Sequence, residues 1–221
     1  MTPLKLQLWL NAHGAALVVD GQCGPKTRDA IKAVFANPHA PAVNDADITV
    51  LASRLGCTPK QLKAVSIVES GGKAYDDQGR PKILYERHIF SRLTKHIHDT
   101  TAFSNPKGGG YNDSSWDKLV NAACKDADAA FASCSWGKFQ IMGMHWRLLG
   151  YSSPIDMAYE TVKSEAASYE MLARFIEKNN MKGALQRLST NPSDNVAFAS
   201  SYNGPAFRNF KYHEKLARAM A

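Results

Sequence analysis

Cysteine is scarce in this sequence of 221 residues, and no two cysteines have C-x-x-C spacing: Cys23, Cys57, Cys124 and Cys134. Four widely spaced cysteines are too few for a disulfide-stapled scaffold in a chain of this length, so we expect free, buried thiols. Histidine is equally dispersed. The closest pair, His96 and His98, would point to different sides of a strand or helix. We therefore expect neither a metal site nor a cofactor.

Long hydrophobic runs are also missing. No stretch of about 18 apolar residues occurs, so we expect no membrane-spanning helix and no stable membrane insertion. The fairly apolar segment from Leu4 to Val19 is interrupted by Gln7, Asn11 and His13, and it has no small-residue cleavage site. It lacks the features of a signal peptide, and we expect the protein to be made in the cytoplasm.

Negative charge is under-represented, because 27 lysines and arginines outnumber 20 aspartates and glutamates to give a net charge of +7. Such a protein is drawn to a polyanion, whether nucleic acid, an acidic membrane face or the bacterial wall. Near the C-terminus, one acid, Glu214, is outnumbered by four cations: Arg208, Lys211, Lys215 and Arg218. Nucleic acid is disfavoured because no recognition helix rich in Arg, Asn or Gln follows the N-terminal turn.

The first 40 residues have the pattern of short helices around a turn. Apolar residues from Leu6 to Leu10 precede Asp20-Gly21, and Pro25 opens a second stretch of helical periodicity. Prolines and small residues follow between positions 37 and 45, a composition typical of a linker. We therefore divide the chain into a module at 1–40, a linker at 41–46 and a larger domain at 47–221.

The strongest helix signal of the larger domain lies just before two glycines. Thr58 can cap the helix, Pro59 suits its first position, and Gln61 completes a capping box. The helix should continue through an apolar run and end at Ser70-Gly71-Gly72, which places Glu69 on its last turn.

The remaining pattern is mostly helical. Residues 82–86 alternate as a strand does, residues 104–115 resemble an exposed loop, and further helices are indicated over 116–132, 139–149, 161–178 and the C-terminal segment. We expect a mainly α (α+β) protein with a small β element between helices.

The N-terminal module contains Leu6-Gln7, followed by the string D-G-x-x-G-x-x-T-x-x-A-I, which begins at Asp20-Gly21 and includes Gly24 and Thr27. Asp-Gly makes a tight turn, and Gly24 precedes a helix on which Thr27 packs inward. The string resembles the small three-helix peptidoglycan-binding module found beside many wall hydrolases. The resemblance implies that these four residues belong to a wall-binding module, in which Cys23 replaces a large apolar residue.

Four further strings follow in order: Val65-x-x-Val68-Glu69-Ser70-Gly71-Gly72, Gly79-Arg80-Pro81-Lys82-Ile83-Leu84-Tyr85-Glu86-Arg87-His88, Ser135-Trp136-Gly137-Lys138-Phe139-Gln140-Ile141-Met142-Gly143 and Tyr202-Asn203-Gly204-Pro205. Together they resemble the phage N-acetylmuramidase family. Two of them are also similar to strings of lytic transglycosylases and goose-type lysozymes, where a glutamate at a helix end faces a G-x-x-Q-I segment across the sugar cleft. The resemblance implies a lysozyme-like catalytic domain.

Glu69 has the environment that a catalytic acid requires. Cleavage of a glycosidic bond needs a carboxyl group that is still protonated near neutral pH, which means a raised pKa. Glu69 follows an apolar run that would desolvate its carboxylate, and it lies at a helix C-terminus, where the helix dipole disfavours negative charge.

A second carboxylate is expected near the predicted strand, where Asp76, Asp77 and Glu86 are the candidates. We choose Glu86 because it lies in the family string; the alternative is an ion pair with Arg87 or Lys82. A separation of about 6.5–9.5 Å from Glu69 would favour an inverting reaction, and about 5–5.5 Å a covalent intermediate.

Sugar-binding groups are expected around the acid. Ser135 and Gln140 would contact hydroxyl and acetamido groups, and Trp136, like Phe139 and Trp146, would offer a flat face to a pyranose ring. The alternative for each aromatic residue is an ordinary core position. By the same resemblance, Tyr202 and Asn203 would contact substrate near Glu69.

The resemblance implies a monomeric endolysin that hydrolyses the β-1,4 bond between N-acetylmuramic acid and N-acetylglucosamine in peptidoglycan. Without a signal peptide, it would depend on a holin to reach the wall in the periplasm. A lytic transglycosylase, which leaves a 1,6-anhydro product, and a non-catalytic wall-binding protein are the alternatives. A zinc amidase or cysteine peptidase is disfavoured because their ligand cluster and Cys-His context are missing.

Overall fold

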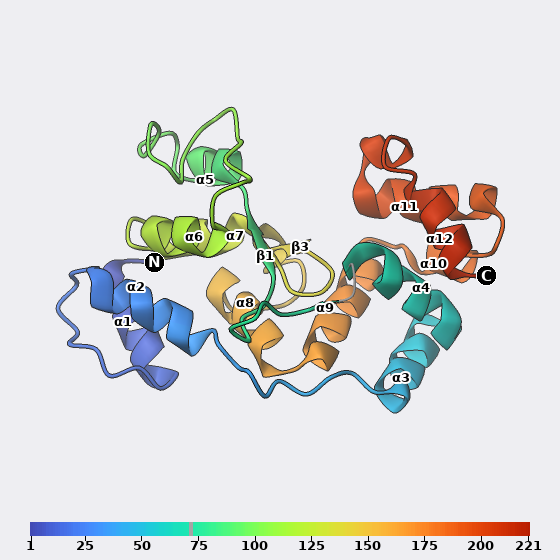
Figure 1. The fold of residues 1–221 in the computed structure, drawn as a ribbon, viewed down its shortest axis with the longest axis horizontal. Coiled ribbons are helices and arrows are strands. Elements are labelled where there is room, and N and C mark those ends of the chain that lie inside the picture. The colour runs from blue at the N-terminus through green and yellow to red at the C-terminus, as the bar shows by residue number, and fades with distance from the viewer. Residues whose placement is uncertain (71–72) are drawn as a thin grey trace.

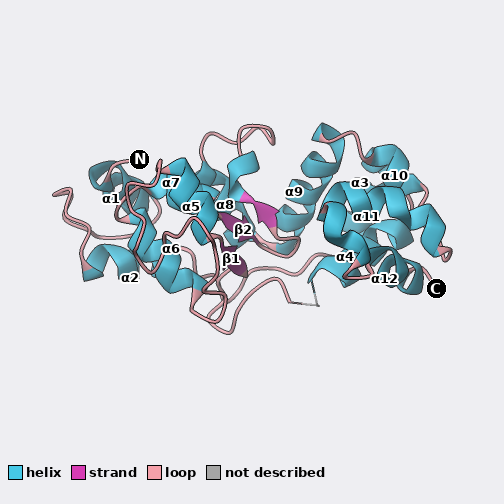
Figure 2. Cartoon of the chain, turned by 90° about the horizontal axis from the view of Figure 1, so that it is seen from above, coloured by secondary structure: helices cyan, strands magenta, loops and turns pink. Residues whose placement is uncertain are grey.

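The computed structural model describes residues 1–70 and 73–221, without the side chain of Ser70. The described residues form a mainly helical molecule with one small sheet, which confirms the predicted fold class. The helices gather in two lobes with the sheet between them (Figure 1, Figure 2). In the described part of the chain, no helix has the length and apolar character needed to cross a membrane.

The first lobe combines both N-terminal helices with the middle of the chain: α1 (Pro3–Ala12), α2 (Pro25–Val34), α5 (Arg87–Leu93), α6 (Ser115–Ala123), α7 (Ala127–Ala132) and α8 (Pro154–Lys163). Its core is rich in aromatic rings. The ring of Phe35 lies 5.3 Å from that of Phe131 and 5.7 Å from that of Trp136. Leu6 and Ile31 are buried in the same cluster. The N-terminal segment therefore shares one core with later helices.

Polar contacts also join the N-terminal helices to the rest of the first lobe. The indole N–H of Trp9 on α1 donates to Asp156 Oδ1 of α8 at 2.9 Å. Lys32 of α2 pairs with Asp117 of α6 at 2.6 Å. Residues 1–40 contain two α-helices rather than the three expected, and α6 packs against α2. The larger domain thus supplies packing that a free-standing module would have to supply itself.

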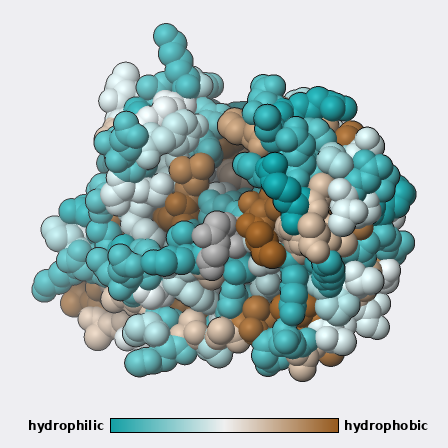
Figure 3. Space-filling model, turned by 45° about the vertical axis from the view of Figure 1, so that its right-hand side comes forward, coloured by the Kyte–Doolittle hydropathy of each residue, from teal (hydrophilic) through white to brown (hydrophobic). Residues whose placement is uncertain are grey.

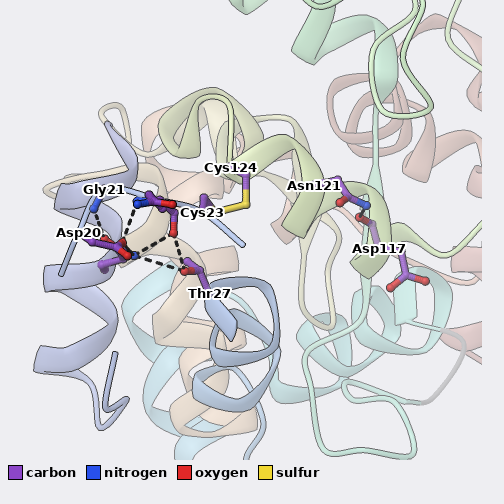
Figure 4. Close-up of a disulfide and its surroundings, with 9 residues drawn as sticks. Asp20, Gly21, Cys23, Thr27, Asp117, Asn121 and Cys124 are labelled. Carbon is purple, nitrogen blue, oxygen red and sulfur yellow. Dashed lines mark hydrogen bonds between the residues drawn. A yellow bond between two sulfur atoms is a disulfide. The ribbon is translucent and has the colours of Figure 1, made fainter. Parts of the chain in front are cut away.

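A disulfide between Cys23 and Cys124 joins the N-terminal loop to the end of α6, with a Cα–Cα distance of 5.2 Å (Figure 4). The expectation of free, buried thiols is therefore wrong for these two residues; it holds for Cys134, whereas Cys57 is free but only half-buried. The two bonded cysteines are separated by 101 positions in the sequence. Cysteine spacing alone does not reveal a pairing of that kind, because packing of the two segments brings the sulfur atoms together.

The segment predicted as a linker is held against the protein. Asn37 donates through Nδ2 to the carbonyl of Val162 at 3.0 Å. The backbone N–H of Glu165 donates to the carbonyl of Pro41 at 2.9 Å, and the Glu165 carboxylate accepts from the N–H of Val43 at 3.0 Å. The chain therefore crosses from the first lobe to the second along a fixed path at the junction of α8 and α9.

The second lobe contains the remaining helices: α3 (Asp45–Leu55), α4 (Pro59–Ser70), α9 (Glu165–Lys178), α10 (Lys182–Gln186), α11 (Val196–Asn203) and α12 (Tyr212–Ala219). Their apolar faces form a second core around residues such as Leu172 and Phe198. The predicted capping box of α4 is present, since Gln61 N–H donates to Thr58 Oγ1 at 3.2 Å and Thr58 N–H donates to Gln61 Oε1 at 2.9 Å.

The sheet is antiparallel, with strand order β1-β2-β3: β1 (Ile83–Tyr85), β2 (Cys134–Trp136) and β3 (Ile141–Met142). β1 confirms the predicted strand. The helix predicted over 139–149 is wrong, because β3 and a 3-10 turn at Gly143–His145 occupy part of it. Trp136 packs in the core of the first lobe, whereas Phe139 and Ile141 pack in that of the second. The β2–β3 hairpin therefore connects the lobes.

Two predicted helices are each divided in two. The helix expected over 116–132 becomes α6 and α7, because Asp126 caps a new helix by accepting from Ala129 N–H at 3.2 Å. The helix expected over 161–178 is broken at Ser164, whose hydroxyl accepts from Ala167 N–H at 3.1 Å. In both cases a short polar side chain accepts a hydrogen bond from a backbone N–H group. It thereby interrupts the first helix and caps the start of the next one.

Candidate active site

Glu69 lies on the last turn of α4, whose C-terminal end is at the side of the second lobe that faces the first (Figure 1). Leu62 and Val65 on the same helix are buried in the second core, whereas Ile67 is exposed. Glu69 itself is half-buried. The next two residues, Gly71 and Gly72, lie outside the described part of the chain. The molecular surface is hollowed between the lobes, with apolar side chains on both sides of the hollow (Figure 3).

Asn203 is the hydrogen-bond partner of Glu69. It ends α11, and its Nδ2 lies 3.1 Å from Glu69 Oε1 and 3.2 Å from Oε2, so one amide group donates to both carboxylate oxygens. The chain then leaves the helix at Gly204, where φ is +74°, a value suited to glycine. The Tyr202-Asn203-Gly204 string thus places an amide directly on the predicted acid.

The pKa of Glu69 is raised from its ordinary value of 4.5 to about 7. Burial is the main cause, because it removes water from the charged form; the hydrogen bonds from Asn203 and the charge of Lys215 oppose the rise. With a pKa near 7, a large share of molecules carry the proton at neutral pH. That is the state in which a carboxyl group can protonate a glycosidic oxygen.

Two tyrosines border the acid. Burial and the charge of Glu69 both raise the pKa of Tyr202 and of Tyr212 above the usual range. The Tyr202 hydroxyl donates to the carbonyl of Phe139 at 2.9 Å, which ties α11 to the turn of the hairpin. Tyr202 was predicted to contact substrate, and its hydroxyl proton is engaged within the protein. In the structure this hydroxyl fixes α11 against the hairpin.

The hairpin string is largely structural. Trp136 is 1% exposed, stacks on Phe131 with ring centroids 5.5 Å apart, and donates its indole N–H to the Phe131 carbonyl. The expectation that Trp136 offers a face to a sugar ring is therefore wrong, and so is that for Phe139, which is 2% exposed. Both rings fill cores because the hairpin lies between the two lobes.

Ser135 and Gln140 are paired with each other. The Ser135 hydroxyl donates to Gln140 Oε1 at 2.7 Å, and Gln140 Nε2 donates to the carbonyls of Gly137 at 2.9 Å and Lys82 at 3.2 Å. Both N–H donors of this amide are thus used, and Ser135 is buried. Instead of presenting free donors to sugar hydroxyls, the pair fixes the hairpin, in which Gln140 has a left-handed φ of +51°.

Of the three candidate second carboxylates, Glu86 has the least exposed side chain. It follows β1, its side chain is 17% exposed, and its Oε2 accepts from the Tyr111 hydroxyl at 2.9 Å. His88 Nδ1 lies 3.3 Å from the same oxygen. Its partners are therefore Tyr111 and His88 rather than the Arg87 or Lys82 that an ion-pair role would use.

The two aspartates have other surroundings. Asp76 accepts hydrogen bonds from Arg80 Nε at 2.8 Å and from the backbone N–H groups of Gln78 and Arg80, which closes the turn before β1. The side chain of Asp77 is 100% exposed and lies 3.9 Å from Lys73. Asp76 therefore closes the turn before β1, and Asp77 is a solvated surface residue.

The N-terminal string is organised around Gln7, a residue that is 2% exposed. Gln7 Nε2 donates to Asp20 Oδ1 at 2.9 Å, and Gln7 Oε1 accepts from the N–H of Gly21 at 2.8 Å. Thr27 lies 3.5 Å from the same Nε2 (Figure 4). The structure brings Asp20, Gly21 and Thr27 together through this amide. Gln7 belongs to the N-terminal resemblance, but the sequence pattern did not indicate that its amide would join the other residues of the string.

A pocket of ≈ 550 Å³ lies beside this cluster, and its lining includes Leu17, Val18, Gly24, Lys26 and Thr27. Gly24 and Thr27 therefore lie at a concave surface as well as in the Gln7 cluster. Among the residues that the structure describes, no group of three or more His, Cys, Asp or Glu side chains is arranged to hold a metal ion.

Comparisons with known proteins agree with this geometry. The family model described as N-acetylmuramidase matches residues 58–221. The crystal structure of the Burkholderia AP3 phage endolysin superposes with a TM-score of 0.73 and 33% sequence identity, covering 99% of this chain and 92% of that one. The likeness thus includes the N-terminal helices as well as the matched region. The chain matches none of the curated proteins with which it was compared.

Proposed function

Because the chain belongs to the N-acetylmuramidase family, we propose that it is an endolysin that hydrolyses the β-1,4 bond between N-acetylmuramic acid and N-acetylglucosamine. The chain is a lysozyme-type glycosidase. The observation that carries the proposal is the half-buried Glu69, whose pKa is raised to about 7 and whose two oxygens are held by Asn203. This is the protonation state and the fixed orientation that a general acid needs.

In the proposed reaction, Glu69 transfers its proton to the glycosidic oxygen as the bond from that oxygen to the anomeric carbon breaks. Water adds to the anomeric carbon and gives its proton to a base, for which we propose Glu86 because it is a half-buried carboxylate beside β1. Glu86→Gln should then reduce activity strongly, whereas Asp77→Asn should not. Full activity of Glu86→Gln would remove Glu86 from the mechanism and leave the role of Glu69 intact.

Mass analysis of the products tests the bond and the acceptor together. Hydrolysis with this specificity leaves a reducing N-acetylmuramic acid, which borohydride converts to its alditol. A lytic transglycosylase would leave a 1,6-anhydro product that lacks one water and resists reduction. A product with N-acetylglucosamine at the reducing end would contradict the proposed bond.

We further propose that the N-terminal helices bind the wall through the pocket beside Gln7. The supporting observations are its concave surface, exposed Val18 and Lys26, and the resemblance of its string to wall-binding modules. Deleting residues 1–40 would remove part of the first core, so a point change is the sounder test. Val18→Glu should weaken sedimentation with insoluble walls and leave cleavage of soluble fragments unchanged. Unchanged sedimentation would contradict a wall-binding pocket.

The proposed site of action is the wall, reached after the membrane has been permeabilised. Expression alone should then be tolerated by a bacterial host, and lysis should follow when a holin or another pore-forming agent is added. Lysis by the full chain without such an agent would contradict this route.

A further inference from the structure

A groove of ≈ 410 Å³ lies between α4 and α12, next to the acid. Its lining is Ile67, Val68, Lys215, Arg218 and Ala219. Ile67 and Val68 immediately precede Glu69 on the last turn of α4, although Glu69 itself does not line the groove. Lys215 connects the two sites, because it lines the groove and its charge also lowers the pKa of Glu69.

The groove has one apolar wall and one cationic wall. Ile67 is 63% exposed, an unusual degree for an isoleucine on a helix whose other apolar residues form core. Lys215 and Arg218 are exposed, and within residues 1–70 and 73–221 neither has a carboxylate oxygen within 4.0 Å. Glu214 of the same helix lines a second groove with Thr190 and Pro192, and Arg218 borders both grooves. Lys215 Nζ lies 5.1 Å from the centre of the Tyr212 ring, but in the described part of the chain neither cation is paired with a carboxylate, so both can meet an external anion.

Peptidoglycan offers a substituent with matching chemistry. Every second sugar of the glycan strand carries a short peptide stem, which contains alanine methyl groups and free carboxylates. An extended stem could place methyl groups on Ile67 and Ala219 and a carboxylate on Lys215 or Arg218, since guanidinium and ammonium groups bind carboxylates through charge-assisted hydrogen bonds. A bare polysaccharide such as chitin offers neither group.

We propose that the α4–α12 groove binds the peptide stem of the muramic acid residue at the scissile bond. This inference rests on the proposed function, because it names the part of the substrate that lies beside Glu69. Binding the stem there would hold the sugar in register with the acid, so the enzyme would favour strands that carry stems over strands that lack them.

Two exposed positions test the groove without touching the acid. Arg218→Ala removes the charge at the end of the groove farther along α12, and Ile67→Ser removes the apolar wall. The substrates are purified glycan strands with their stems and the same strands after an amidase has removed the stems. Each variant should lower kcat/KM on stem-bearing strands about 3- to 10-fold and change kcat/KM on stripped strands less than about 2-fold. Lys178→Ala, an exposed cation elsewhere on the second lobe, should change neither value.

The outcomes separate this inference from the function on which it rests. An equal loss on both polymers would overturn it, because the groove would then serve the sugar backbone, including the lactyl carboxylate that the amidase leaves behind. No loss on either polymer would overturn it as well, provided that melting curves show both variants folded. If the parent chain cleaved neither polymer, the proposed function itself would fail, and with it this inference.

Discussion

Two carboxylates in this protein receive hydrogen bonds from a side-chain amide, yet their pKa values move in opposite directions. Asp20 accepts from Gln7 Nε2 at 2.9 Å and from the N–H of Gln22 at 2.8 Å, and these bonds lower its pKa. Glu69 accepts from Asn203 at 3.1 and 3.2 Å, and its pKa nevertheless rises to about 7. The hydrogen bonds act alike, since each favours the charged form.

Burial makes the difference. Asp20 is exposed to water, so its carboxylate stays hydrated and the hydrogen bond from Gln7 lowers its pKa further. The carboxyl group of Glu69 has lost most of its hydration between α4, α11 and α12. A side-chain amide that donates to a carboxylate therefore does not show by itself whether that carboxylate is a catalytic acid or part of a structural hydrogen-bond cluster. In the N-terminal cluster the pair shapes a loop, whereas at Glu69, the proposed proton donor, the amide orients a carboxyl group whose pKa is raised by desolvation.

The largest effect is expected from Glu69→Gln, which keeps the shape of the side chain and removes the transferable proton. Activity should fall at least about 10²-fold on isolated walls, since general acid catalysis alone contributes about 10²–10⁴-fold. The hypothesis is falsified if the folded variant cleaves peptidoglycan at close to the parent rate. Asp77→Asn, which changes a fully exposed carboxylate, is the matched control and should remain active.

Breaking the covalent support of the N-terminal cluster should give the next largest effect. Replacing Cys23 and Cys124 together with serine removes a cross-link that closes a loop of 101 positions, and the free energy of unfolding should fall by about 2–4 kcal/mol. Urea unfolding measures this loss. A reducing agent should bring the parent to the level of the variant without affecting the variant, and equal stability of both oxidised proteins would contradict a stabilising cross-link.

Removing the amide at the active site should change the pH profile as well as the rate. Asn203→Ala deletes hydrogen bonds that favour the carboxylate, so the pKa of Glu69 should rise further. The acid works protonated, and the alkaline fall in activity should therefore move to higher pH, while kcat decreases about 10-fold because the carboxyl group is less well oriented. Ser200→Ala on the same helix is the control. An unchanged pH profile would show that Asn203 does not influence the acid.

The smallest effect is expected at Asp20. Its pKa lies below the ordinary value of 3.8, so its charge stabilises the fold above that pH and the contribution disappears as the pH falls through the lowered pKa. Asp20→Asn should therefore slightly lower the melting temperature at neutral pH and have no effect in strong acid. Asp29→Asn, an exposed residue on α2, provides the comparison, and a larger effect in acid than at neutral pH would contradict this sign.

Local sequence signals predicted the parts of the fold that depend on neighbouring residues. The Thr58–Gln61 capping box and the placement of Glu69 on the last turn of α4 follow from short-range patterns. The breaks at Asp126 and Ser164 were missed because apolar periodicity continues across both positions, and the capping side chains redirect the chain only in its tertiary context.

Within the candidate site, the structure gives several of the predicted residues contacts other than those expected from the sequence. Trp136 and Gln140 lie in a family string, but the hairpin sits between two cores, so one fills a core and the other holds the turn. Lys215 was noted only as part of a basic segment; its effect on Glu69 depends on packing of α12 against α4. The Cys23–Cys124 bond and the shared first core depend on long-range contacts that spacing does not encode.

Infrared difference spectroscopy can show whether Glu69 is protonated near neutral pH. A spectrum of the parent minus that of Glu69→Gln isolates the C=O stretch of the protonated carboxyl group, and its intensity can be followed with pH. This band should disappear with a midpoint near pH 7, where the pKa of Glu69 lies. A midpoint near the ordinary value of 4.5 would contradict the claim that burial prepares this residue as the acid.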